Sequence, residues 1–163
     1  MSTSIERQRV YELLSTFETT MMVTHAPSGP FDCRPMHIAD SEIESGGPIW
    51  FISSTEGRKT REIGTDPKTL LTFQDGRRYL TIWGRAEIVD DRTRLARIWK
   101  PSYDRWAPSG TADPTIRLIK FVPHSAEYWD NSGDTPSTYF DAPATEPLTV
   151  EDETPERHGR TGL

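Results

Sequence analysis

The 163 residues carry 25 acidic and 19 basic side chains, for a formal net charge of −6, and 34% of them are hydrophobic. This length suits one domain, and no apolar run approaches the roughly 18 residues that a membrane-spanning helix needs. The N-terminus lacks a basic stretch followed by an apolar segment, as a secretory signal would have. Cys33 is the only cysteine, which excludes an internal disulfide framework. We therefore expect a cytoplasmic domain without membrane association.

The negative charge is concentrated at the C-terminal end. Residues 1–129 hold 17 acidic and 17 basic side chains, whereas residues 130–163 hold 8 acidic and 2 basic ones with four prolines. Such a segment buries too little apolar surface to offset the entropy lost on ordering. We predict a domain over residues 1–130 and a tail over 131–163 that is disordered or lies along the surface. Because nucleic-acid binding needs clustered Lys and Arg, the neutral body argues against it.

Hydrophobic periodicity predicts three short helices and six or seven strands. The helices have apolar residues at the i, i+3, i+4 spacing, and the strands are alternating or short apolar runs between turn residues. In chain order we expect a helix with the apolar face Val10, Leu13, Leu14 and Phe17, strands over 21–25, 34–38 and 49–53, a helix between 55 and 63, strands over 70–73 and 79–89, a helix with Leu95, Ile98 and Trp99, and strands over 116–122 and 126–129.

Cap and turn residues define the limits of these elements. We expect Gly64 to end the second helix, Asp75-Gly76 to form a hairpin turn, and Asp90 or Asp91 to cap the third helix. Since the links are short and regular crossover helices are missing, the sequence predicts a mainly β fold. It is a six- to seven-stranded antiparallel barrel with peripheral helices.

The sequence lacks the familiar catalytic and metal-binding signatures. It contains no Walker loop and no GxGxxG, HExxH or GxSxG pattern. The histidines have no ligand spacing, at His25, His37, His124 and His158. We therefore assign no catalytic residue and predict no metal site.

One cluster has the composition of an anion site. Residues 53–60, SSTEGRKT, follow an apolar strand and open a helix. Free N–H groups at a helix N-terminus, hydroxyls and two cations all favour a phosphate. Arg34, on the neighbouring predicted strand, would reach the same anion. The simpler alternative is a plain capped surface helix.

Several runs, in their order and spacing, resemble a known family. They are Arg34-Pro35-Met36, Trp50 to Ser54 with Gly57-Arg58-Lys59, Asp66-Pro67, and Tyr79 to Ala86. Over about residues 8–130 these resemble the pyridoxamine 5′-phosphate oxidase superfamily. Its general stress protein 26-like branch is similar in the closing segments Trp99-Lys100-Pro101, Trp106, Gly110, Asp113-Pro114 and Glu127-Tyr128-Trp129.

The resemblance implies an FMN-binding split β-barrel that forms a homodimer with the flavin at the subunit interface; FAD and F420 are the alternative cofactors. It also implies the site residues, position by position. Arg58 and Lys59 match the phosphate-binding step, Ser53 and Ser54 the strand end beside the ribityl phosphate, Arg34, Pro35 and Met36 the strand along the flavin, and Tyr79 a glutamine position near it. Trp106 would cover the flavin ring, or else be an ordinary core or interface residue.

Two departures from the oxidase argue against vitamin B6 oxidation. Ala39 stands where the oxidase has a lysine for the substrate phosphate, and the C-terminal Arg-Leu-His-Asp-Arg motif is absent. The resemblance therefore implies another FMN-dependent oxidoreductase, linked to stress response, whose redox partner is an unknown small molecule. The flavin would carry the redox chemistry itself. A non-catalytic flavin carrier or sensor, and a binder of F420 or haem, are the alternatives.

Overall fold

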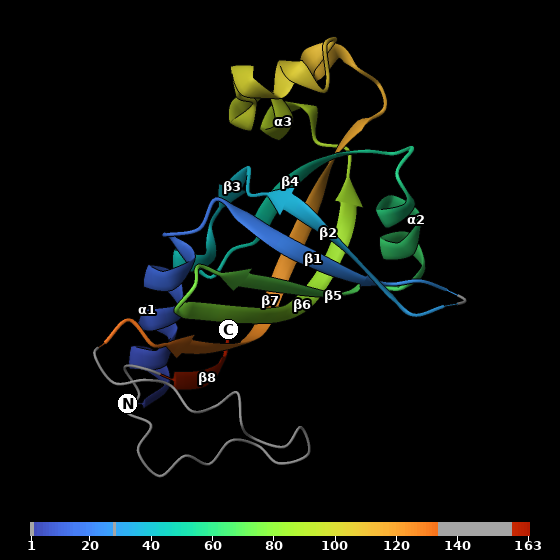
Figure 1. The fold of residues 1–163 in the computed structure, drawn as a ribbon. Coiled ribbons are helices and arrows are strands. Elements are labelled where there is room, and N and C mark those ends of the chain that lie inside the picture. Colours follow the sequence, from blue (N-terminus) through green and yellow to red (C-terminus); the bar gives the residue numbers. More distant parts are fainter. Residues whose placement is uncertain (1, 28, 134–157) are drawn as a thin grey trace.

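One curled antiparallel sheet forms most of the computed structural model, which describes residues 2–27, 29–133 and 158–163 (Figure 1). The strand order is β2-β1-β5-β6-β7-β4-β3, and β8 pairs with β7 outside this path. The strands are β1 Thr19–His25, β2 Phe31–His37, β3 Asp40–Ser41, β4 Ile49–Ser54, β5 Lys68–Gln74, β6 Arg78–Val89, β7 Ile116–Asp130 and β8 His158–Gly162. The predicted mainly β antiparallel fold is confirmed.

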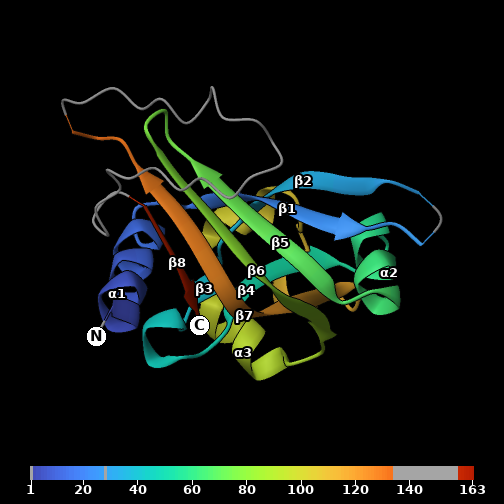
Figure 2. The ribbon, with the colours of Figure 1, turned by 90° about the horizontal axis from the view of Figure 1, so that it is seen from below.

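Three helices lie around this sheet. Helix α1 (Ser2–Leu14) packs beside β8, and α2 (Arg58–Thr65) packs near the opposite end of the sheet, against β1 and β6 (Figure 2). Helix α3 (Arg92–Ile98) forms a lobe above the sheet with the 3-10 turns η2 (Pro101–Arg105) and η3 (Gly110–Ala112), and η1 (Ile43–Ser45) precedes β4. No helix in the described part of the chain has the length and apolarity to cross a bilayer.

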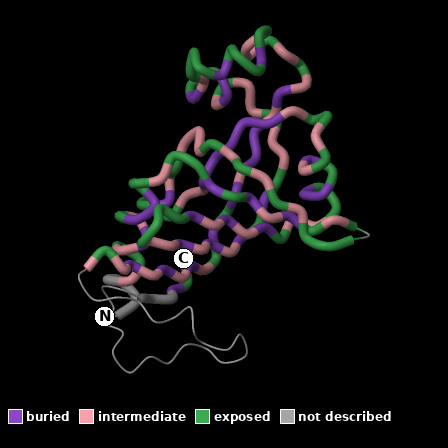
Figure 3. Tube along the Cα trace, in the orientation of Figure 1, coloured by how far each residue is buried: buried purple, intermediate pink, exposed green. Residues whose placement is uncertain are grey.

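Buried residues concentrate along the central strands (Figure 3). Strand β5 alternates as expected for a sheet with one buried face, since Thr69, Leu71 and Phe73 are buried and their neighbours are not. The main core lies inside the curl of the sheet and includes Val10, Met22, Phe51, Leu71, Ile82, Phe121 and Tyr128. A second, smaller core joins β4 to the lobe through Trp50, Ile52, Leu95, Ile98, Tyr103 and Leu118.

The turn and cap predictions are confirmed in two places and wrong in one. Asp91 caps α3, because its Oδ1 accepts a hydrogen bond from the Arg94 amide at 2.8 Å. Gly76 has a φ of +77° in the β5–β6 turn, a conformation that favours glycine. Gly64, however, does not end α2. The Asp66 amide donates to the Glu62 carbonyl at 2.8 Å, so the helix continues past the glycine to residue 65.

The sequence predicts two strands at the end of the domain, but β7 is continuous from Ile116 to Asp130. Pro123 and His124 separate the two apolar runs without ending the strand. The pairing shifts there, because Trp83 lies opposite Ser125 while Gly84 lies opposite Pro123, which leaves His124 as the extra residue of a bulge. A bulge is where a sheet tolerates a proline, which has no N–H to donate.

The last residues of the chain return to the sheet. Strand β8 pairs antiparallel with residues 125–129 of β7, and Thr161 on it is buried. The Leu163 amide donates to the His124 carbonyl at 2.7 Å, and Arg7 Nε donates to the Gly162 carbonyl at 2.8 Å. The sequence did not predict this strand, because HGRTG has no apolar alternation. Of the predicted tail over 131–163, residues 134–157 lie outside the described residues.

Candidate functional site

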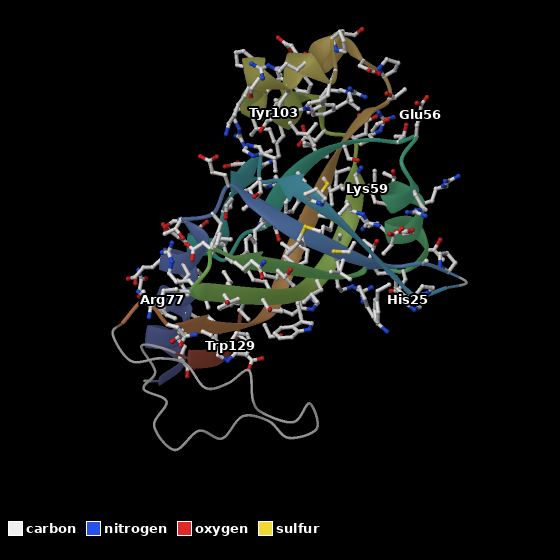
Figure 4. The ribbon with its side chains drawn as sticks, in the orientation of Figure 1. His25, Glu56, Lys59, Arg77, Tyr103 and Trp129 are labelled. Atoms are coloured by element: carbon white, nitrogen blue, oxygen red, sulfur yellow. The ribbon has the colours of Figure 1, made fainter. Side chains whose placement is uncertain are left out.

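The candidate anion site lies where the N-terminus of α2 meets β1 and β2 (Figure 4, Lys59). At its base is Glu62, whose side chain is only 3% exposed. Glu62 Oε2 accepts hydrogen bonds from Thr24 Oγ1 at 2.5 Å and from Arg34 Nη2 at 2.9 Å. Helix α2 brings Glu62 here because it lies one turn after Arg58 on the same helix face.

Arg34 is anchored inside this network. Antiparallel pairing places it opposite Met22, on the inner side of β2. Besides Glu62, its Nη1 donates to Thr24 Oγ1 at 2.5 Å and to the Met22 carbonyl at 3.2 Å. The predicted proximity of Arg34 to the Arg58–Lys59 step is therefore present, but the guanidinium is already engaged by the fold.

Arg58 is also paired, although its side chain is 72% exposed. Its Nε lies 2.7 Å from Asp32 Oδ2 and 3.7 Å from Glu62 Oε1. Asp32 Oδ2 is also 3.5 Å from Arg34 Nη2. One carboxylate on β2 thus faces two of the three cations that the sequence predicts for an anion.

Lys59 is the cation whose charge is uncompensated. Among the described residues, no carboxylate pairs with its ammonium group, which lies over Gly57, 3.4 Å from where a Cβ on that glycine would stand. Partial burial and the nearby Arg34 guanidinium lower the pKa of Lys59 from its ordinary value. Both causes favour an anion beside Lys59, since an anion would relieve the desolvation and the repulsion.

The serines and threonine of the predicted cluster shape the turn before α2. Ser54 Oγ accepts from the Glu56 amide at 3.2 Å, and Thr60 Oγ1 donates to the Ser54 carbonyl at 3.0 Å. Ser53 is buried and its Oγ donates to the Ser54 carbonyl at 3.3 Å. Gly57, the N-cap residue of α2, supplies no side-chain cap, and the first turn of the helix holds no acidic residue. The helix end is thus open to an external anion.

An aromatic pocket of about 140 Å³ lies farther along the same strands. It is bounded by β2, β4 and the lobe, with Pro35, Met36, His37, Ala39, Ile52, Tyr103 and Trp106 in its wall. Trp106 is 50% exposed, and its ring centroid lies 6.1 Å from that of Tyr103. The buried Tyr103 hydroxyl has no hydrogen-bond partner among the described residues, and burial raises the pKa of this phenol. A lining without charged side chains suits the edge of a flat, uncharged ring.

Strands β2 and β4 connect the two features. On β2, His37 is three positions after Arg34, about 10 Å along the extended chain. On β4, Ile52 in the pocket is followed directly by Ser53 and Ser54 at the turn into α2. A ligand with an anionic group at one end and a flat ring at the other would lie along these strands.

Tyr79 does not join the other predicted site residues. It lies on β6 opposite Gln74 and Trp129, and its hydroxyl donates to the Gly76 carbonyl at 3.2 Å. Tyr79 lies at the end of β6 beside the β5–β6 turn, whereas the Ala86 amide, seven residues or about 23 Å farther along the strand, donates to the Pro67 carbonyl just after α2. Within one chain, Tyr79 therefore cannot contact a group held at Lys59.

A larger groove of about 720 Å³ lies on the outer face of β1, β5 and β6. Its lining is mainly apolar, and Phe31 on its rim is 73% exposed. His25 on the same rim lies 3.5 Å from Asp66 Oδ2. In the described residues, no group of three or more His, Cys, Asp or Glu side chains is placed to hold a metal ion.

Sequence reasoning missed Asp32, Glu62, Thr24 and Tyr103. The spacing contained a signal for two of them. Asp32 is two residues before Arg34 on a strand and Glu62 four residues after Arg58 on a helix, so each shares a face with its cation. Thr24 and Tyr103 carry no local signal, because they reach the site only through the sheet and the lobe.

Comparison with known proteins places this fold and its motifs in a family. Residues 6–146 match the family described as pyridoxamine 5′-phosphate oxidase like. The chain belongs to this family. The resemblance inferred from the motifs is thereby confirmed, and no curated protein matches the chain.

Solved structures support the same fold for this pyridoxamine 5′-phosphate oxidase-like protein. A candidate general stress protein 26 from Jannaschia sp. CCS1 is 23% identical with a TM-score of 0.70 over 100% of both chains. A Clostridium acetobutylicum protein related to general stress protein 26 is 20% identical with a TM-score of 0.67, over 78% of this chain and 89% of its own. The general stress FMN/FAD binding protein of Xanthomonas citri is 24% identical with a TM-score of 0.66, over 82% and 94%. The predicted split barrel is confirmed.

Proposed function

We propose that this protein binds a flavin through its phosphate, with FMN as the first candidate, and that it is a flavin-dependent oxidoreductase. The observation that carries the proposal is the uncompensated Lys59 ammonium at the open N-terminus of α2, in line with an aromatic pocket along β2 and β4. A flavin mononucleotide has this pattern, with a phosphate at one end and a flat ring at the other. The similarity to the Xanthomonas citri FMN/FAD binding protein supports it.

The residues present fit such a group. Lys59 and the amides of the first turn of α2 would hold the phosphate, and Arg58 would join them if it left Asp32. Pro35 and Met36 would lie along the ring, while Trp106 and Tyr103 would limit the access of water to it. When bound, the flavin would supply hydride and electron transfer, so the protein need provide only orientation and shielding.

We also propose a homodimer, because one chain leaves the site incomplete. Tyr79 lies at the end of β6 far from α2 in the same chain, so a second copy would be needed to bring it to a flavin at Lys59. The outer face of the sheet offers an apolar surface for that copy, with the groove beside Trp83 and Leu70 and the exposed side chains of Phe31 and Met21. Exposed apolar patches of this kind mark interaction sites.

For a homodimer we expect a mass of about twice 18.6 kDa in light scattering. Leu70→Arg places a charge on the outer face and should shift the protein toward monomer. The exposed Arg61 on α2 serves for the matched control, Arg61→Glu, which should leave the dimer intact. A monomeric wild type at micromolar concentration would contradict the shared site.

The visible spectrum of the purified protein tests flavin binding directly. Oxidised flavin absorbs at about 375 and 450 nm, whereas F420 and haem have different bands. We expect the flavin bands, or their appearance as added FMN binds. A colourless protein that fails to bind FMN would rule out both the enzyme and the flavin carrier.

Reduction kinetics distinguish the oxidoreductase from a carrier or sensor. Rapid mixing of the flavin-loaded protein with NADH or NADPH should bleach the long-wavelength band, which then returns with an electron acceptor. Absence of bleaching with either donor would favour the carrier. The stress-response role and the cytoplasmic location stay predictions from the sequence.

A further inference from the structure

Asp32 occupies the position in the cation cluster that an external anion would need. Its Oδ2 lies 2.7 Å from Arg58 Nε and 3.5 Å from Arg34 Nη2. Its Oδ1 accepts from the Cys33 amide at 3.1 Å, which holds the carboxylate in this orientation. Both arginines therefore face a carboxylate that the chain itself supplies.

We propose that Asp32 is an internal competitor for the ligand phosphate: it occupies Arg58 until the ligand displaces it, and so sets the affinity and the phosphate dependence of binding. This inference rests on the proposed flavin function. A carboxylate and a phosphate are both acceptors that pair with the same face of a guanidinium. Two anions at one cation repel each other. Arg58 therefore pairs with a phosphate only after it has left Asp32.

The contacts of the three cations show why Arg58 is the one that can change its anionic partner. Its side chain is 72% exposed, so it has room to leave Asp32, and exposed ion pairs contribute little to stability. Arg34, by contrast, is held by Glu62, Thr24 and the Met22 carbonyl. Lys59 has no carboxylate partner among the described residues and stays available throughout. Lys59 can therefore bind an anion at any time, whereas Arg58 can bind one only after it leaves Asp32.

Glu62 is the other carboxylate near Arg58, and it cannot play this part. Its side chain is 3% exposed, and its Oε2 is occupied by Thr24 and Arg34. Oε1 is 3.7 Å from Arg58 Nε, a full ångström farther than Asp32 Oδ2 at 2.7 Å. Asp32 is therefore the carboxylate that competes with a phosphate for Arg58.

Asp32→Asn tests the competition, because asparagine keeps the shape and the Oδ1 acceptor for the Cys33 amide while removing the charge. Fluorescence titration should show FMN binding about two- to fivefold tighter than in the wild type, the range expected when a weak ion pair no longer competes. Riboflavin, which has no phosphate, should bind both proteins equally.

Asp90→Asn is the matched control. Asp90 pairs with Arg92 Nε at 2.9 Å and with Arg117 at 3.3 Å, beside α3 and away from the cluster. The change removes the same charge from a similar ion pair, so FMN affinity should stay at the wild-type value. Tighter FMN binding in this control as well would reduce the effect to overall charge and overturn the proposal.

Inorganic phosphate gives a second readout that does not depend on the flavin. Added phosphate should raise the thermal unfolding midpoint more in Asp32→Asn than in the wild type, relative to chloride at equal ionic strength. Equal or weaker phosphate and FMN binding in Asp32→Asn overturns the competition while leaving flavin binding intact. Failure of every variant to bind FMN or riboflavin overturns the proposed function instead, and the phosphate measurement still decides the competition.

Discussion

Lys59→Ala should weaken FMN binding by about 1.5–3 kcal/mol, the value of one hydrogen bond to a charged group. Arg58→Ala should cost less, about 0.5–1 kcal/mol, because its side chain is 72% exposed and already paired with Asp32. The double change Arg58→Ala with Lys59→Ala should therefore lose about 2–4 kcal/mol. Isothermal titration with FMN measures all three variants.

Arg61→Ala on the same helix is the matched control. Arg61 is exposed and makes no ion pair with another described residue, so its removal should leave FMN affinity unchanged. Riboflavin should bind the double variant and the wild type equally. Unchanged FMN affinity in the double variant would refute the phosphate assignment.

The affinity for FMN should also depend on pH through Lys59. Burial and Arg34 lower the pKa of this lysine, and only its protonated form attracts a phosphate. The contribution of Lys59 is therefore complete below its pKa and is lost as the pH rises through it. Lys59→Arg, whose charge persists at high pH, should move this loss to more alkaline pH.

Arg34→Met should lower the free energy of unfolding by about 3–5 kcal/mol, the usual cost of breaking a buried ion pair from one side. Glu62 would keep a buried charge without its partner, since its side chain is 3% exposed. The Thr24 hydroxyl and the Met22 carbonyl would each lose a hydrogen bond as well. Urea unfolding measures the effect.

Two further variants distinguish this buried pair from a general effect of losing arginine. Arg34→Met combined with Glu62→Leu should recover a large part of the loss, because no uncompensated charge is left inside. Arg97→Met on the exposed side of α3 should stay within about 0.5 kcal/mol of the wild type. A stable Arg34→Met protein with weakened FMN binding would show instead that Arg34 serves the ligand and not the fold.

Local spacing was sufficient for most of the fold. The alternation of Arg34 and Met36, the hairpin turn at Gly76 and the cap at Asp91 depend on residues within a few positions of each other. Errors arose where distant pairing decided the outcome. Strand β7 continues through Pro123 because β6 accommodates a bulge there, and β8 forms because β7 offers it a free edge.

The candidate site was likewise predictable only in part from the sequence. The run 53–60 and Arg34 identified the cations from composition and spacing alone. Their pairing was not predictable, because Asp32 on β2 and Glu62 on α2 meet Arg58 and Arg34 only after the helix packs against the strands. The aromatic pocket likewise needs Tyr103 and Trp106, which follow β2 in the chain by more than sixty residues.

The charge distribution shows which properties the sequence determined and which the tertiary structure determined. The sequence by itself determined a neutral body, an acidic C-terminal segment, a mainly β fold and a cationic step at Arg58-Lys59, because composition, periodicity and short spacings are local properties. Only the tertiary structure decided which charges are free. Among the described residues, carboxylates from other elements compensate Arg34 and Arg58 but not Lys59, since ion pairing depends on distances that the packing of α2 on β1 and β2 creates.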